Sequence, residues 1–256
     1  MPQPAADHDT SSPTLLERHR WLVFVLPLAV YMLGGSLEPT PKQPGGAMLG
    51  LALPYSSYPL LYTLKIVLTL AAILLVCPGY RQFPWRFHPW VVLLGVAGAG
   101  LWIGLCHLHL EQKLLEPLGM GRLVDLAARP GYNPLHELHD QPAWALAFLI
   151  VRFFGLAAVV PLIEEFFLRG FVMRFVMAAE WWKVPFGQVS AAAVAAGILV
   201  PVLTHPGEMI AAAAWFGLVT WLMARTRNIW DCVGVHAITN LSLGIYVVIS
   251  GDWALM

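Results

Sequence analysis

The sequence predicts an all-α membrane protein, built as a polytopic bundle of about seven to eight transmembrane helices. Hydrophobic residues make up 58% of the 256 residues and charged residues make up 12%, roughly half the charged share of a soluble protein. The apolar residues fall into several runs close to the ~20 residues that a helix needs to cross a bilayer. Because the formal net charge is zero, no overall basic field indicates a nucleic-acid partner. The expected surroundings are a lipid bilayer.

The apolar runs define the expected helices in chain order. A polar tail, residues 1–20, comes first and is expected to lie in the cytoplasm. The helices that follow are predicted at 21–37, 60–77, 89–106, 144–178, 189–204, 209–224 and 231–250. The fourth run is too long for one straight span. Pro161 lies in its middle and removes one backbone hydrogen bond, so we expect a kink or a break there.

The connections and the basic residues set the expected orientation. The loop at 38–59 is rich in proline and glycine, which predicts an irregular external connection, and the loop at 107–143 carries leucines among charges, which predicts a short interfacial helix. Cytoplasmic connections carry an excess of Lys and Arg. With the N-terminus inside, the cytoplasmic side holds Arg18, Arg20, Arg81, Arg86, Arg174, Lys183, Arg225 and Arg227, and the outer side holds Lys42, Lys113, Arg122 and Arg129. This excess favours a cytoplasmic N-terminus, and we expect a bacterial inner membrane.

Two adjacent carboxylates, Glu164 and Glu165, interrupt the fourth apolar run, and Arg169 follows them. A charged group at membrane depth is costly unless it is paired or faces a wet cavity. Glu165 and Arg169 are four residues apart, so they share a helix face and are expected to form a structural ion pair. Glu164 is turned by about 100° from Glu165 and needs a different partner. This carboxylate is therefore the candidate for chemistry.

Two later helices carry polar residues that a bilayer penalises. His205 closes the fifth run beside a proline, where an interfacial or capping role is the plain alternative. His236 and Asn240 are four residues apart in the last run and share one face; taken alone, they are equally suited to hydrogen bonds between helices. Together with Glu164 they form a set that hydrolysis needs: a carboxylate that takes a proton from water, a histidine that orients the water, and an amide and an imidazole that stabilise an oxyanion.

These residues resemble the motifs of the CPBP family of intramembrane proteases, named for CAAX prenyl proteases and bacteriocin-processing proteins. The family carries Glu-Glu-x-x-x-Arg on one helix, Phe-x-x-x-His on the next and His-x-x-x-Asn on a later one. The matching residues are Glu164, Glu165 and Arg169 in the first motif, His205 in the second, and His236 and Asn240 in the third. Pro201 stands where the family usually has phenylalanine. The resemblance covers roughly residues 145–250.

The resemblance implies an intramembrane glutamic-type endopeptidase that hydrolyses a peptide bond near the C-terminus of a membrane-embedded or lipid-linked protein or peptide. The implied roles are a general base at Glu164, assistance to it from His205, oxyanion stabilisation by His236 and Asn240, and a supporting pair of Glu165 and Arg169. No cofactor is implied. A carboxylate and two histidines could bind zinc, but the glutamic-type chemistry of the family is favoured.

The resemblance also divides the chain into a three-span region with an external loop at 21–143 and a CPBP-like catalytic helix bundle at 144–256. The overall layout is similar to the CAAX-protease-related proteins of bacterial exosortase systems. Two functions of other classes use the same residues. One is a membrane scaffold or regulator that keeps the fold without cleavage, and the other is a proton-coupled transporter with the Glu and His groups as a relay. The sequence shows no inverted repeat or pair of broken helices, which a transporter often has.

Overall fold

The structure is a computed structural model that describes residues 15–41, 43–46, 49–119 and 131–256. Within these ranges the regular elements are helices, and one isolated antiparallel bridge joins Gly45 and Leu53. The all-α class predicted from composition is confirmed. The elements in chain order are α1 (Leu15–Arg18), α2 (Leu22–Gly35), η2 (Tyr55–Ser57), α3 (Tyr58–Tyr80), α4 (Val91–His107), α5 (Leu110–Leu115), η3 (Glu116–Leu118), α7 (Pro134–Glu137), α8 (Pro142–Phe154), η4 (Gly155–Val159), α9 (Val160–Glu165), η5 (Phe166–Val172), α10 (Met173–Phe175), η6 (Trp181–Lys183), α11 (Ala191–Thr204), α12 (Met209–Thr226), α13 (Ile229–Ser250) and η7 (Trp253–Leu255).

Each of the seven apolar runs forms a helix close to its predicted bounds. Four helices in the described part of the chain are long and apolar enough to cross a membrane: η2 with α3, the continuous helix from α8 to α10, α12 and α13. A fifth arises if α4 and the α5–η3 helix count as one span, with a bend of 41° between them. α2 and α11 are shorter apolar helices of 14 residues each. The chain is therefore an integral membrane protein.

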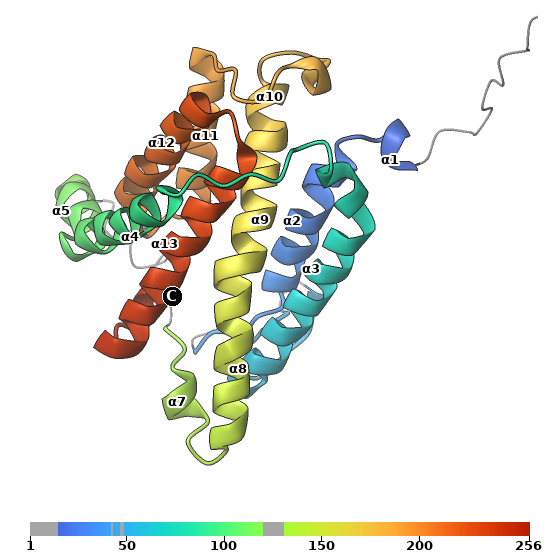
Figure 1. The fold of residues 1–256 in the computed structure, drawn as a ribbon. Coiled ribbons are helices and arrows are strands. Elements are labelled where there is room, and N and C mark those ends of the chain that lie inside the picture. Colours follow the sequence, from blue (N-terminus) through green and yellow to red (C-terminus); the bar gives the residue numbers. More distant parts are fainter. Residues whose placement is uncertain (1–14, 42, 47–48, 120–130) are drawn as a thin grey trace, which may run out of the picture.

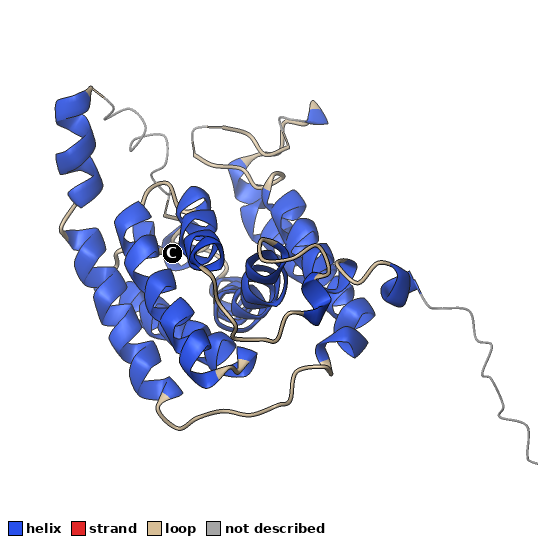
Figure 2. Cartoon of the chain, turned by 90° about the horizontal axis from the view of Figure 1, so that it is seen from above, coloured by secondary structure: helices blue, strands red, loops and turns tan. Residues whose placement is uncertain are grey.

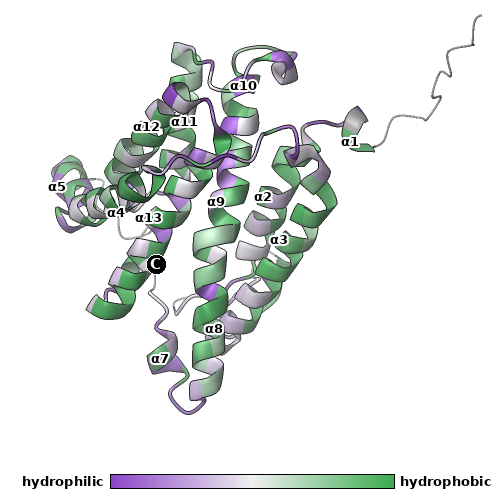
Figure 3. Cartoon of the chain, in the orientation of Figure 1, coloured by the Kyte–Doolittle hydropathy of each residue, from purple (hydrophilic) through white to green (hydrophobic). Residues whose placement is uncertain are grey.

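The continuous helix from α8 to α10 runs through the middle of the bundle, with α2 and α3 on one side and α4, α11, α12 and α13 on the other (Figures 1 and 2). Two buried apolar clusters flank it. One is centred on aromatic side chains such as Phe24 and Phe166, and the other on α12 and α13 with Trp215 and Phe216. Apolar residues cover most of the helices, whereas hydrophilic positions interrupt the central helix (Figure 3). The acidic pair therefore lies between two cores.

The central helix continues through Pro161 without a break. The predicted irregularity takes the form of two π-turns: η4 lies directly before the α9 segment that contains Pro161, and η5 begins directly after the acidic pair. Proline cannot donate a hydrogen bond to the carbonyl one turn earlier in a helix. A π-turn changes the hydrogen-bond pattern locally, so the helix can continue past the proline. The α9 segment with the acidic pair thus lies between two π-turns.

Lys65 on α3 is a charged side chain buried within the bundle. The residue is 5% exposed, and its Nζ lies 2.6 Å from Glu38 Oε1. The ammonium also lies over the rings of Tyr31 and Tyr62, at 4.3 and 4.5 Å from their centroids. A partner carboxylate just beyond the end of α2 therefore compensates the buried ammonium.

The loop predicted to hold an interfacial helix, residues 107–143, contains α5 and η3. Leu114, Leu115 and Leu118 lie on these elements, and Glu111 on α5 is 5% exposed and accepts a hydrogen bond from the backbone N–H of Ile210. The segment therefore packs against the start of α12. Part of this loop lies outside the described residues, including Leu123, Val124, Asp125 and Leu126. Three basic residues counted for the outer side also lie outside them: Lys42, Arg122 and Arg129.

Candidate active site

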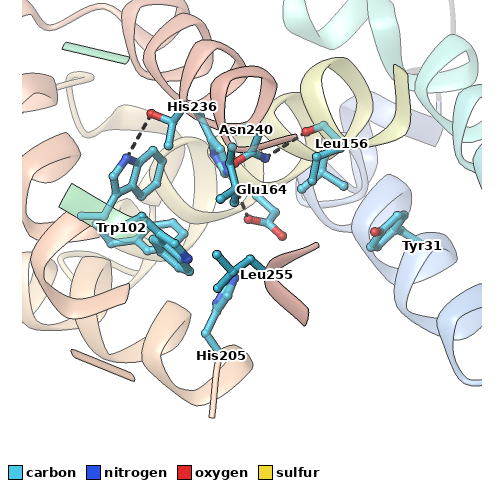
Figure 4. Close-up of a pocket in the computed structure, with 13 residues that line it drawn as sticks. Tyr31, Trp102, Leu156, Glu164, His205, His236, Asn240 and Leu255 are labelled. Atoms are coloured by element: carbon cyan, nitrogen blue, oxygen red, sulfur yellow. Dashed lines mark hydrogen bonds and ion pairs between the residues drawn. The ribbon is translucent and has the colours of Figure 1, made fainter. Parts of the chain in front are cut away.

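One cavity of about 220 Å³ brings together Glu164, His205, His236 and Asn240. Glu164 comes from α9 in the central helix, His205 follows the last residue of α11, and His236 and Asn240 come from α13. Figure 4 shows Glu164 near the centre of the cavity, with His205 on one side and His236 and Asn240 on the other. Residues separated by up to 76 positions in the sequence therefore face the same space.

Glu165 and Arg169 form the expected ion pair, and both side chains are fully buried. The guanidinium Nη1 contacts Glu165 Oε2, and Nη2 lies 3.5 Å from the carbonyl oxygen of Phe216. The other oxygen of Glu165, Oε1, lies 2.9 Å from Nδ1 of His236. A buried carboxylate needs such partners on both oxygens, because burying an unpaired charge is costly. Glu165 therefore joins the central helix to α13.

The bond to Glu165 sets the orientation of His236. A carboxylate beside a guanidinium accepts hydrogen bonds, so Nδ1 of His236 is the donor and carries a proton. The other ring nitrogen, Nε2, then faces the cavity and lies 4.0 Å from Glu164 Oε2. The indole of Trp215 packs against the imidazole with ring centroids 4.6 Å apart. Glu165 thus fixes the orientation of the His236 ring, and Nε2 of that ring points toward Glu164.

A main-chain oxygen sets the orientation of His205 in the same way. Nδ1 of His205 lies 2.8 Å from the carbonyl oxygen of Pro201, and a carbonyl only accepts, so Nδ1 donates. A neutral His205 therefore presents the lone pair of Nε2. The ring packs edge to face against Trp102, with centroids 5.6 Å apart. Pro201, the residue that departs from the family motif, lies inside α11 and supplies the carbonyl that holds this histidine.

Asn240 is anchored through its amide nitrogen. Nδ2 donates to the carbonyl oxygen of Leu156 at 2.9 Å, and Leu156 lies in the π-turn η4. The bond places the amide at the cavity wall, as Figure 4 shows. It also satisfies a carbonyl in the irregular part of the central helix. One amide hydrogen of Asn240 is therefore used for structure, which leaves the second for a ligand.

A second, largely apolar cavity adjoins the first. This cavity of about 260 Å³ shares Glu164 and Phe216 with the first, and its other lining includes Leu28 and Met32 from α2 and Phe167 from the central helix. Met32 is 55% exposed, so this cavity reaches the outer surface of the bundle. A membrane protein exposes such surface to lipid. Glu164 therefore stands where a polar cavity meets an apolar one.

Zinc binding at the site would depend on how closely the carboxylate and imidazole groups around the cavity approach one another. Among the residues that the structure describes, no set of three His, Cys, Asp or Glu side chains converges on one point. A zinc ion needs ligands at about 2.0–2.3 Å. Glu165 and Nδ1 of His236 are engaged with each other, which leaves Glu164, His205 and Nε2 of His236 around the cavity.

Several residues of the cavity lining were not predicted from sequence, and three of them come from elements far from the motifs. Tyr31 of α2, Trp102 of α4 and Leu255 of η7 line the cavity together with the predicted set. Each sits in an apolar stretch, where an aromatic or leucine side chain gives no sign of a functional position. Only tertiary packing places them at the site: α2 packs against the central helix, whereas α4 and η7 pack against α13 (Figure 4).

Comparison with known proteins agrees with the motifs. Residues 143–242 match the family model described as type II CAAX prenyl endopeptidase Rce1-like. The matched segment contains the acidic pair, Arg169, both cavity histidines and Asn240. The chain matches no curated protein and no solved structure.

Proposed function

We propose that the chain is an integral-membrane peptidase that cleaves by glutamic-type chemistry. Residues 143–242 match the family model of type II CAAX prenyl endopeptidase Rce1-like, which supports peptidase activity. The proposed substrate is a membrane-embedded or lipid-linked protein or peptide, cut near its C-terminus. The observation that carries the proposal is the convergence of Glu164, His205 and His236 on one cavity.

The two adjacent glutamates have different surroundings, which supports different roles. The side chain of Glu164 is 26% exposed and lines the cavity, whereas that of Glu165 is fully buried between Arg169 and His236. A general base must reach the water that it activates. Glu164 is therefore the proposed base, and Glu165 is a positioning residue that acts through His236.

The proposed first step is attack by water on the scissile carbonyl. The water is held between the Glu164 carboxylate and Nε2 of His205, which both accept hydrogen bonds. Glu164 takes one proton as the water oxygen bonds to the carbonyl carbon, and the carbonyl oxygen becomes an oxyanion. His205 is set for this role because Pro201 holds its Nδ1. Its contribution is to align the lone pair of the water with the carbonyl carbon.

Collapse of the tetrahedral intermediate completes the reaction. The C–N bond breaks, and Glu164 delivers its proton to the leaving nitrogen, which gives a carboxylic acid and an amine. The second amide hydrogen of Asn240 and a protonated His236 stabilise the oxyanion before collapse.

The adjoining apolar cavity supports the proposed substrate class. Its walls are apolar side chains, it reaches the outer surface of the bundle, and it ends at the proposed base. A peptide attached to a lipid chain, or a segment of a transmembrane helix, could approach Glu164 from the bilayer along this surface without crossing water. A soluble peptide has no comparable reason to prefer this route.

Metal-independent hydrolysis is part of the proposal, and zinc is the alternative. A bound zinc ion would activate water as a Lewis acid. Purified protein that keeps its activity in excess chelator supports activation by Glu164. Loss of activity in chelator, followed by recovery on adding zinc alone, would decide for the metal.

We also place the N-terminus in the cytoplasm and the protein in a bacterial inner membrane. The basic residues that support this orientation and that the structure describes include Arg81, Arg86, Arg174 and Arg227, which lie at or near helix ends. Fusing an enzyme that is active only outside the cytoplasm to either terminus tests the orientation. Activity of the N-terminal fusion would reverse it.

The central experiment compares membrane peptides by mass spectrometry in cells that carry the wild type or Glu164→Ala. We expect shortened C-termini on particular membrane proteins to disappear with the variant, at equal protein level. The matched control is Glu180→Ala, a half-exposed glutamate that pairs with Lys183 far from the cavity. Processing that survives Glu164→Ala would contradict the proposal and favour a scaffold. Proton-coupled uptake by vesicles that fails on Glu164→Gln, without any cleavage, would favour a transporter.

A further inference from the structure

Trp102 on α4 is an unexplained buried donor at the catalytic cavity. The residue is 7% exposed and lines the cavity, yet its indole Nε1 has no hydrogen-bond partner among the residues that the structure describes. Figure 4 shows the indole at the cavity wall beside His205. Native proteins leave few buried N–H groups unpaired, and each one calls for an explanation. α4 lies outside the segment matched by the family model.

The position of α4 is fixed by close contact with α13. A Cβ added to Gly95 would lie 2.5 Å from Ile238 Cβ, and one added to Gly98 would lie 2.8 Å from Thr239 Oγ1, so both positions require glycine for this approach. Thr239 also donates to the carbonyl oxygen of Gly95 at 2.9 Å. Trp102 follows Gly98 by four residues and therefore extends from the same face of α4. The close packing thus holds the indole at the cavity.

A neighbouring tryptophan, Trp215, differs from Trp102 in that its indole N–H has a hydrogen-bond acceptor within the protein. Trp215 is also buried and lines the same cavity, but its Nε1 donates to Thr239 Oγ1 at 3.2 Å. The two indoles pack edge to face with ring centroids 6.4 Å apart. Both indoles therefore pack against other rings at the cavity. They differ in that the protein supplies an acceptor for Trp215 and supplies none for Trp102 among the described residues.

We infer that the indole N–H of Trp102 binds a main-chain carbonyl oxygen of the peptide substrate in the catalytic cavity. A peptide brings carbonyl acceptors into the cavity, and a buried donor gains most from meeting one there. The contact with His205 places this donor next to the pair that activates water. The inference rests on the proposed function, because it assumes that a peptide enters this cavity. Trp102 would then bind substrate although it lies outside residues 143–242, which match the family model.

The test measures hydrolysis of an internally quenched peptide by purified protein in lipid vesicles, with the peptide in S-farnesylated and unmodified forms. Trp102→Phe keeps an aromatic ring and removes the N–H. Because the lost bond forms with a neutral acceptor in substrate, we expect kcat/KM to fall about ten-fold, mainly through a higher KM. The melting temperature should stay at the wild-type value, since no bond within the protein is lost.

Trp230→Phe is the matched control. Trp230 is 8% exposed, lies outside the cavity lining and donates its Nε1 to the carbonyl oxygen of Phe83 at 3.1 Å. This variant loses a bond within the protein, so its melting temperature should fall while KM stays unchanged. Replacing Trp102 by 3-benzothienylalanine, which has sulfur in place of the N–H at nearly the same size, should reproduce the kinetic defect of Trp102→Phe.

The outcomes separate the inference from the proposed function. If cleavage requires Glu164 and Trp102→Phe has the kcat/KM of the wild type, only the inference is overturned. A defect confined to kcat would also overturn it, because it would assign the N–H to the transition state rather than to bound substrate. If cleavage persists in Glu164→Ala, the proposed function fails and the inference fails with it.

Discussion

Nδ1 of His236 lies 2.9 Å from Glu165, while Nε2 of the same ring lies 4.0 Å from Glu164. One imidazole therefore connects the two adjacent glutamates, although helix geometry turns their side chains about 100° apart. Arg169 completes the connection by pairing with Glu165. The order of contacts is arginine, buried glutamate, histidine and cavity glutamate. Each member restrains the next, as the outer partners of a catalytic group do in other active sites.

The first prediction compares the two glutamates by isosteric replacement. Glu165→Gln leaves Arg169 buried without its counter-charge, so we expect a loss of about 3–5 kcal/mol of stability. Glu164→Gln removes a partly exposed cavity group and should leave stability nearly unchanged while abolishing cleavage. Thermal unfolding in detergent, followed alongside peptide cleavage, measures both effects. Equal melting temperatures for the two variants would contradict this division of roles.

The second prediction compares two glycines of α4, one that faces α13 and one that faces open space. A Cβ at Gly95 would meet Ile238 Cβ at 2.5 Å, so Gly95→Ala should push α4 from α13 and cost about 1–3 kcal/mol. Gly100 on the same helix is the control, because a Cβ added there would have no atom within 4 Å. Gly100→Ala should be neutral or stabilise the protein by up to ~1 kcal/mol. Thermal unfolding checks both, and similar shifts in the two variants would refute the packing argument.

The helices could be predicted from sequence because bilayer length and hydrophobicity define them locally. The run predicted at 209–224 appears as Met209–Thr226, and the run at 231–250 appears as Ile229–Ser250. Helix spacing likewise predicted that Glu165 would meet Arg169, since both lie on one helix. A kink or a break was predicted at Pro161, but the two π-turns beside it were not, and one of them holds a carbonyl that accepts a hydrogen bond from Asn240 of another helix.

Contacts between helices distant in sequence could not be predicted. Asp231 is fully buried and binds His88 through both oxygens, with its Oδ2 2.6 Å from Nδ1 and its Oδ1 2.9 Å from the backbone nitrogen. Nothing within the sequence of α13 indicates a partner 143 residues earlier. The bond between His236 and Glu165 has the same origin. Spacing assigns a residue to a helix face, but the neighbour on that face depends on how the helices pack.

The third prediction concerns the anchor of Asn240. Asn240→Asp replaces the donor Nδ2 by an oxygen that would face the carbonyl oxygen of Leu156. The loss leaves a buried acceptor without its donor and places two acceptors together, so we expect a cost of about 1–3 kcal/mol. Cleavage should also decrease, since the oxyanion loses an amide donor. Hydrogen exchange of the η4 segment, Gly155–Val159, should increase; unchanged protection there would show that the bond does not hold the π-turn.

The fourth prediction concerns the buried pair of Lys65 and Glu38. Lys65→Met removes the ammonium 2.6 Å from Glu38 Oε1 and should cost about 3–5 kcal/mol near neutral pH, because it leaves a carboxylate without its partner. Combining it with Glu38→Gln should recover part of this loss, since the double variant holds no unpaired charge. A double variant whose loss equals the sum of the single losses would show that the pair does not interact.

The same pair gives the chain a pH dependence whose sign follows from burial. Burial raises the pKa of Glu38 above its ordinary value of 4.5, and Lys65 opposes this shift. A raised pKa means that the fold favours protonated Glu38, so its contribution to stability is fully present below the unfolded pKa and is lost as the pH rises through the folded pKa. When the Lys65 ammonium is removed, the pKa of Glu38 rises further. Lys65→Met should therefore be more destabilised at about pH 8 than at about pH 5 relative to the wild type, and thermal unfolding at the two pH values measures the difference. The additional loss at high pH should vanish when Glu38→Gln is added, because that variant has no carboxylate left to ionise.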